Sequence, residues 1–157
     1  MSQSPRIQEY DGLEMPTDFP IEAHQAIRLA VHLRSPELPL WHEFSGAWNA
    51  VRDRFLAATY YSDIFKEAAL THGIGTTHRM RYEEERALFG FFASALSCMD
   101  AAYYGLYAVG AFLSPAEFAL ATSEQRERVK PRFTASAYER AFPGDPIAAV
   151  LRAYLWE

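Results

Sequence analysis

The segment Ala87–Leu113, ALFGFFASALSCMDAAYYGLYAVGAFL, constrains the fold more than any other, because Asp100 is its only charged residue. A segment that is apolar on every side suits either the central helix of a bundle or a membrane span. A charge in the middle of a span costs roughly 2.5 to 3.5 kcal/mol on insertion scales, and Tyr103, Tyr104 and Tyr107 would lie at unfavourable depths. We therefore expect a helix in a bundle, solvated in the turns that precede this segment and buried beyond them, and no membrane span.

Length and composition favour one folded domain. The chain has 157 residues, of which 50% are hydrophobic and 15% aromatic, and burial of so much apolar surface can offset the entropy lost on folding. The formal net charge of −5 argues against a protein whose main role is to bind nucleic acid, since such binding needs clustered Lys and Arg. Cys98 is the only cysteine, which excludes a disulfide within one chain and fits a reducing cytoplasm. Residues 1–20 lack the apolar core of a signal peptide and predict an extended arm, followed by one bundle domain over 21–157.

The remaining pattern predicts an all-α fold built on a long antiparallel helix pair. Between Leu38 and Thr71, apolar residues recur at alternating spacings of three and four, as in the seam of a bundle. A glycine turn then leads into a second long helix over 78–113. Apolar spacing predicts a shorter helix over 21–34, and capping signals predict others starting near Ser114, Thr122 and Asp145. A further helix is expected over 134–142. No alternating pattern stands out, so no strand is expected.

Asp100 is the main candidate for a functional residue. A carboxylate on an apolar helix should be paired, or have a raised pKa, or both. Tyr103 and Tyr104 follow three and four residues later, on the same helix face, and Tyr107 follows one turn beyond them. Two interpretations stay open: a buried structural pair that fixes helix register, or a polar pocket formed by these four residues.

Other chemistry finds no support in the sequence. The histidines show neither Glu-x-x-His nor His-x-x-x-His spacing, so we expect no metal and no cofactor. Cys98 and its neighbouring serines lie in a helix without a nucleophile elbow, so no catalytic residue is assigned. Acidic residues interrupt the basic cluster that runs from Arg126 to Arg132, which favours a solvated helix face over a nucleic-acid surface.

The stretches YEEERALFGFFASALSCMDAAYYGLYAVG and KPRFTASAYERAFPGDPIAAVLRAYL together resemble bacterial helical proteins of the HEPN-like kind, over about Arg79 to Leu155. The resemblance implies a helical bundle, often dimeric. Many such proteins are RNases of toxin–antitoxin or defence systems, and others are non-catalytic. Their active site is an arginine and a following histidine with four to six residues between them. Here the nearest approach is Arg28 and His32, with only three residues between them, so the resemblance implies either a non-catalytic member or a motif beyond Glu157.

These observations predict a cytoplasmic, non-catalytic interaction module that forms a homodimer through an aromatic helix face. The alternative is an enzyme or a small-molecule-binding protein with a polar pocket at Asp100, Tyr103, Tyr104 and Tyr107, RNase-like if the family resemblance holds.

Overall fold

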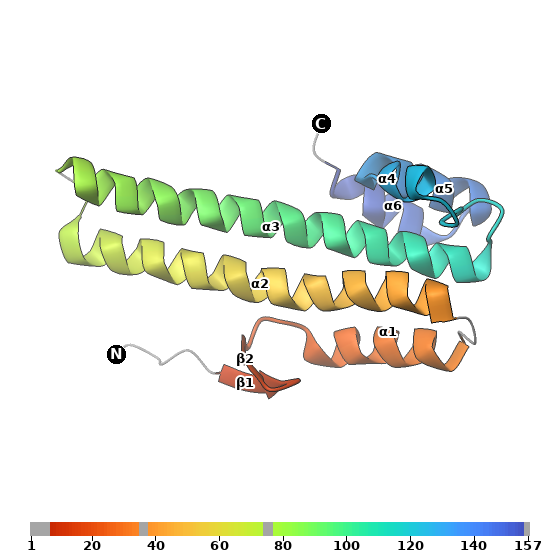
Figure 1. Cartoon of the computed structure of the whole chain (residues 1–157), viewed down its shortest axis with the longest axis horizontal. Coiled ribbons are helices and arrows are strands. Elements are labelled where there is room, and N and C mark those ends of the chain that lie inside the picture. The colour runs from red at the N-terminus through yellow and green to blue at the C-terminus, as the bar shows by residue number, and fades with distance from the viewer. Residues whose placement is uncertain (1–6, 35–37, 74–76, 156–157) are drawn as a thin grey trace. The chain divides into compact units, whose positions relative to one another are not determined.

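The computed structural model describes residues 7–34, 38–73 and 77–155, which fold mainly into helices (Figure 1). The elements are β1 (Ile7–Tyr10), β2 (Leu13–Pro16), α1 (Ile21–Arg34), α2 (Leu38–His72), α3 (His78–Leu113), α4 (Ser123–Glu127), α5 (Pro131–Ala141) and α6 (Pro146–Ala153). The predicted all-α class and the long α2 and α3 helices are confirmed. In the described part of the chain, no helix combines the length and apolar character that crossing a membrane requires.

The first two elements form an antiparallel hairpin, so the expectation that the chain contains no strand is wrong. Ile7 pairs with Pro16, and Tyr10 pairs with Leu13 at the turn. Asp11 and Gly12 connect the strands with φ of 51° and 76°, the left-handed values that a two-residue type I′ hairpin turn requires. An Asp-Gly pair adopts these values readily, and for that reason the predicted arm folds back on itself within residues 7–16.

The chain groups into two compact units, each described here by itself. Unit 1 comprises Met1–Ala23 and Ala50–Cys98, and unit 2 comprises His24–Asn49 and Met99–Glu157. Both α2 and α3 contribute one part to each unit. The predicted division into an arm over 1–20 and one domain over 21–157 stays a prediction.

In unit 1, the hairpin packs on α2 through a small apolar core. Tyr10, Met15 and Phe19 are buried, and Phe55 and Leu56 of α2 pack against them. Tyr10 and Met15 point to the same side of the hairpin because Tyr10 pairs with Leu13, and Met15, two residues further along β2, occupies the diagonal position on that side. Burial of these large side chains fixes the hairpin on the helix, since a two-stranded sheet is only marginally stable alone.

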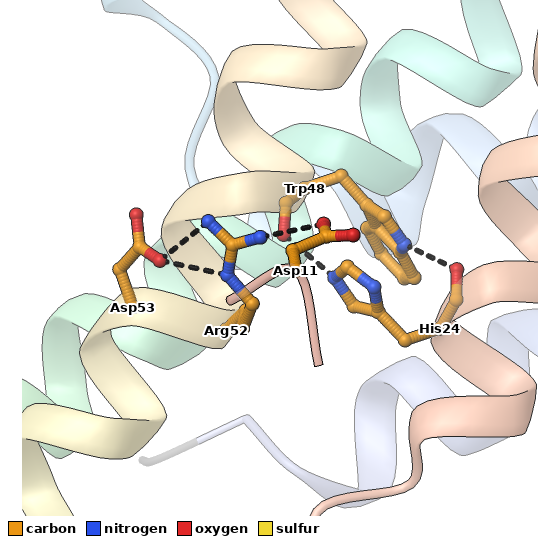
Figure 2. Close-up of polar contacts among 5 residues, drawn as sticks. All are labelled: Asp11, His24, Trp48, Arg52 and Asp53. Carbon is orange, nitrogen blue, oxygen red and sulfur yellow. Dashed lines mark hydrogen bonds and ion pairs between the residues drawn. The ribbon is translucent and has the colours of Figure 1, made fainter. Parts of the chain in front are cut away.

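Arg52 of α2 holds the hairpin turn (Figure 2). Its guanidinium forms ion pairs with Asp11 at 2.7 Å and with Asp53 at 2.8 Å. The same guanidinium lies 5.8 Å from the centre of the Tyr10 ring, within the range of a cation–π contact. Arg52 therefore both neutralises the carboxylate of Asp11 in the turn and covers the Tyr10 ring at the edge of the hairpin core.

Also in unit 1, α2 and α3 approach each other closely. Arg54 donates a hydrogen bond to the Ser97 carbonyl at 2.9 Å, and the Cys98 thiol donates to the Val51 carbonyl at 3.3 Å. Burial raises the pKa of the Cys98 thiol, although the Arg54 charge opposes this shift. A Cβ atom added at Gly90 would lie 2.5 Å from the Tyr61 ring, so an alanine at this position would require that ring to move.

In unit 2, α1 and α2 are joined by a reciprocal contact between His24 and Trp48 (Figure 2). The Trp48 indole N–H donates to the His24 carbonyl at 3.0 Å, and His24 Nε2 lies 2.8 Å from the Trp48 carbonyl. A carbonyl only accepts, so this nitrogen carries a proton. The two rings also stack, with centroids 5.1 Å apart. Buried His24 thus has a structural role that neither its spacing nor its neighbours predicted.

The C-terminal helices of unit 2 cover the end of α3. Phe118 is almost fully buried and contacts the rings of Tyr107, Tyr138 and Phe142. The predicted caps at Thr122 and Asp145 are confirmed, as a capping box for α4 and a side-chain cap for α6. The helix expected at Ser114 is wrong, because this segment forms turns in which Phe118 is directed into the core.

Candidate interaction surface

The outward side of α3 in unit 1 is a continuous apolar face. Between Arg86 and Asp100, the exposed side chains are Leu88, Phe89, Phe92, Ala93 and Leu96, which we call the α3 face. Phe89 is 76% exposed, Phe92 58% and Leu96 52%. The expectation that α3 is buried along this part is therefore wrong.

The exposure follows from which residues α3 turns toward α2. Ala87 is buried, and Gly90, Ser94, Ser97 and Cys98 are half-buried, so small side chains occupy the inward side. Small residues let two helix backbones approach closely. Phe91 is half-buried, whereas Leu88, Phe89, Phe92 and Leu96 lie on the opposite side, where a helix of a single folded chain normally carries polar residues.

A groove continues the α3 face toward α2 within unit 1. Its volume is about 480 Å³. Its lining comes from Tyr60, Tyr61 and Ile64 of α2 and from Arg86, Ala87, Phe89, Gly90, Ala93 and Ser94 of α3. Tyr60 is itself 61% exposed. The face and the groove together form one mostly apolar surface, bordered by the charge of Arg86.

Asp100 is exposed, so the prediction that it is buried on an apolar helix is wrong. Its position explains the exposure: it follows Leu96 by four residues and thus lies on the outward side of α3, one turn beyond the apolar face. Its carboxylate can stay hydrated there, and burial does not force it to find a partner in the core.

The three predicted tyrosines lie in unit 2 and make different contacts. The Tyr103 hydroxyl donates to the Leu151 carbonyl at 2.7 Å, while the Tyr104 hydroxyl donates to Glu43 at 2.6 Å. Tyr107 packs between Phe118 and Phe133. Burial raises the pKa of all three hydroxyls, and the Glu43 carboxylate raises that of Tyr104 further.

A second cavity, in unit 2, lies beside the Tyr104 partner. Its volume is about 420 Å³, and its lining includes Leu40, Glu43, Phe118, Leu120 and Arg126. Arg126 forms an ion pair with Glu43 at 3.2 Å and also donates to the Leu120 carbonyl at 3.2 Å. The carboxylate of Glu43 and the guanidinium of Arg126 therefore neutralise each other's charge at this cavity. The proposed roles of Asp100, Tyr103, Tyr104 and Tyr107 as a binding site stay a prediction, and none of these four residues lines either of the two cavities described above.

Among the described residues, no group of three His, Cys, Asp or Glu side chains is placed so that it could hold a metal ion.

Comparison with known proteins adds no relative: no family model, no curated protein and no solved structure matches this chain.

Proposed function

We propose that this chain is a self-association module and that a second copy covers the α3 face. The observation that supports the proposal is the unbroken apolar character of the exposed side chains between Arg86 and Asp100. Single exposed apolar residues are ordinary on protein surfaces, but a contiguous row with two phenylalanines usually marks a contact site. Burial of apolar surface is worth about 25 cal/mol per Å², so leaving this row in water has a substantial cost.

The charges at the two ends of the face favour a second copy over an unrelated partner. Arg86 precedes the face and Asp100 follows it. A surface with opposite charges at its two ends is complementary to itself when one copy is turned end to end, as in the two-fold symmetry of most homodimers. A face flanked by charges of one sign would instead favour an oppositely charged partner.

We further propose that the module is cytoplasmic, non-catalytic and of the HEPN-like kind. The absence of an arginine–histidine pair at the required spacing in the sequence supports the non-catalytic assignment. An RNase assay on a structured and an unstructured RNA tests it. We expect no cleavage above that of a buffer control, and cleavage that copurifies with the chain through two columns would overturn it.

The alternative function, a small-molecule site at Asp100 and the tyrosines, has weaker support. Asp100 is exposed, and the hydroxyls of Tyr103 and Tyr104 already donate to groups within the protein. These contacts agree with the structural interpretation of the tyrosines.

Sedimentation velocity over a wide concentration range tests self-association. We expect a dimer of the wild-type chain whose dissociation constant rises at least about 100-fold in Phe89→Ser/Phe92→Ser, since buried aromatic anchors carry most of the energy of an interface. A matched control is Leu70→Ser/Val150→Ser, which removes two exposed apolar residues outside the face. Equal weakening by both double variants, or a monomeric wild-type chain at all concentrations, would overturn the proposal.

A further inference from the structure

We propose that the two copies pair their α3 helices antiparallel, across a two-fold axis near Ala93, with Arg86 of each copy facing Asp100 of the other. This inference rests on the proposed self-association and adds the orientation and the register. It also assigns a role to Asp100, the one charge in the longest apolar segment of the sequence.

The first step is the placement of the two charges on α3. This helix is unbroken from His78 to Leu113, so spacing along the sequence determines which side of it a residue occupies. Arg86 and Asp100 are two heptads apart and lie on the same edge of the α3 face. They are about 21 Å apart along the helix at 1.5 Å per residue, too far to pair within one chain.

The second step is that Arg86 and Asp100 are available to another molecule. Both side chains are exposed, and neither forms an ion pair within the part of the chain that the structure describes. The apolar face is nearly centred between them: Arg86 stands three residues before Phe89, and Asp100 four residues after Leu96.

A parallel arrangement does not bring the opposite charges together. In a parallel pair, Arg86 of one copy would lie level with Arg86 of the other and Asp100 level with Asp100, so the opposite charges would stay about 21 Å apart along the pair. In the antiparallel pair, Arg86 faces Asp100 twice, once on each side of the axis, while Phe92 meets Leu96 and Phe89 meets Met99 of the second copy.

Charge reversal tests the register. We expect Arg86→Asp alone and Asp100→Arg alone each to weaken dimerisation at least about tenfold at low salt, because each places like charges opposite one another. Arg86→Asp/Asp100→Arg in one chain should restore the wild-type dissociation constant. Lys66→Asp is the matched control: it makes the same change of charge at an exposed position on α2 and should leave dimerisation within about twofold.

Cross-linking tests the orientation. In a Cys98→Ser background, Ala93→Cys should be linked to its counterpart by a short thiol-specific bis-maleimide, because it lies beside the proposed axis. Tyr82→Cys, also exposed on α3, should not be linked, since antiparallel pairing about an axis near Ala93 separates the two copies of this residue by about 33 Å at 1.5 Å per residue.

The outcomes separate this inference from the proposed function. A dimer that links through Tyr82→Cys, with or without linkage through Ala93→Cys, or one that the double charge reversal does not restore, overturns the antiparallel register while self-association stands. A wild-type chain that stays monomeric overturns both.

Discussion

The two halves of the apolar segment in α3 are both rich in small and large apolar residues but lie in opposite environments. Residues 101–112 in unit 2 are buried or half-buried, whereas in unit 1 Phe89, Phe92 and Leu96 are mostly exposed. Unit 2 supplies α4 to α6 and their connecting turns as a cover, as the contacts of Tyr103 with Leu151 and of Tyr107 with Phe118 show. The apolar content of a helix predicts that its side chains will be buried. Whether the same chain covers them depends on the other helices that pack against it, as α4 to α6 do in unit 2.

The two halves should differ most in how much the free energy of unfolding falls when a phenylalanine is replaced by alanine. Phe118→Ala should lower the free energy of unfolding by about 3 to 5 kcal/mol, because it leaves a cavity among Tyr107, Tyr138 and Phe142. Phe92→Ala should change it by less than about 0.5 kcal/mol at concentrations where the chain is monomeric. Urea denaturation followed by circular dichroism measures both. Similar losses would show that Phe92 is buried within the monomer and that the comparison is wrong.

A smaller difference is expected at two helix glycines. A Cβ atom added at Gly110 would lie 2.4 Å from the buried Phe118 ring, so Gly110→Ala should destabilise by about 1 to 3 kcal/mol. Gly90→Ala meets the Tyr61 ring at 2.5 Å, but that half-buried ring borders the groove and can move toward it. Alanine gains up to about 1 kcal/mol of helix propensity at either position, so the freedom of the Tyr61 ring decides the ranking, and we expect a smaller loss for Gly90→Ala than for Gly110→Ala. The opposite ranking in thermal melts would contradict the difference in packing.

The stability of unit 2 should decrease in alkaline solution. Burial raises the pKa of Tyr104 and Tyr138, and the nearby carboxylates of Glu43 and Asp145, respectively, raise them further. A group with a raised pKa in the fold contributes stability that is present below its unfolded pKa, near 10, and is lost as the pH rises through the folded value.

Urea denaturation between pH 8 and 11 measures this loss, in a Cys98→Ser background so that the thiol does not contribute. We expect the free energy of unfolding to fall above about pH 10 and to fall less steeply in Tyr104→Phe/Tyr138→Phe. An unchanged slope in the double variant would show that these hydroxyls are not held protonated by the fold.

The smallest expected effect is in the hairpin of unit 1. Arg52→Ala removes two ion pairs to partly exposed carboxylates and should cost about 0.5 to 1 kcal/mol, with faster hydrogen exchange confined to β1 and β2. Lys66→Ala, which removes an exposed ion pair with Asp63, is the control and should change neither quantity measurably. Faster exchange throughout unit 1 would mean that Arg52 supports more than the turn.

Much of the helical framework could be predicted from the sequence, because its signals are local. The spacing of apolar residues predicted α2, and Pro146 after Asp145 predicted the start of α6. The hairpin was missed although Asp11-Gly12 is a strong turn signal, because its strands are short and carry acids among their apolar residues. The Ser114 cap signal was misleading, since burial of Phe118 outweighed the local preference for a helix.

The candidate surface could be predicted less well, because it depends on contacts between distant segments. The sequence shows that Ala87–Leu113 is apolar, but not that its small residues face α2 and its phenylalanines face water. One signal was present: Gly90, Ser94 and Cys98 recur at every fourth position, which marks the side of close helix approach and leaves Phe89 and Phe92 on another. The exposure of Asp100 follows from the same assignment of faces.

Hydroxyl-radical footprinting across protein concentration tests most directly whether a second copy covers the α3 face. Phe89 and Phe92 react when exposed, and Tyr154, which is 63% exposed in unit 2, serves as the internal reference. We predict that oxidation of the two phenylalanines falls several-fold relative to Tyr154 as the concentration rises through the dissociation constant. A ratio that stays constant from dilute to concentrated solution would contradict the account.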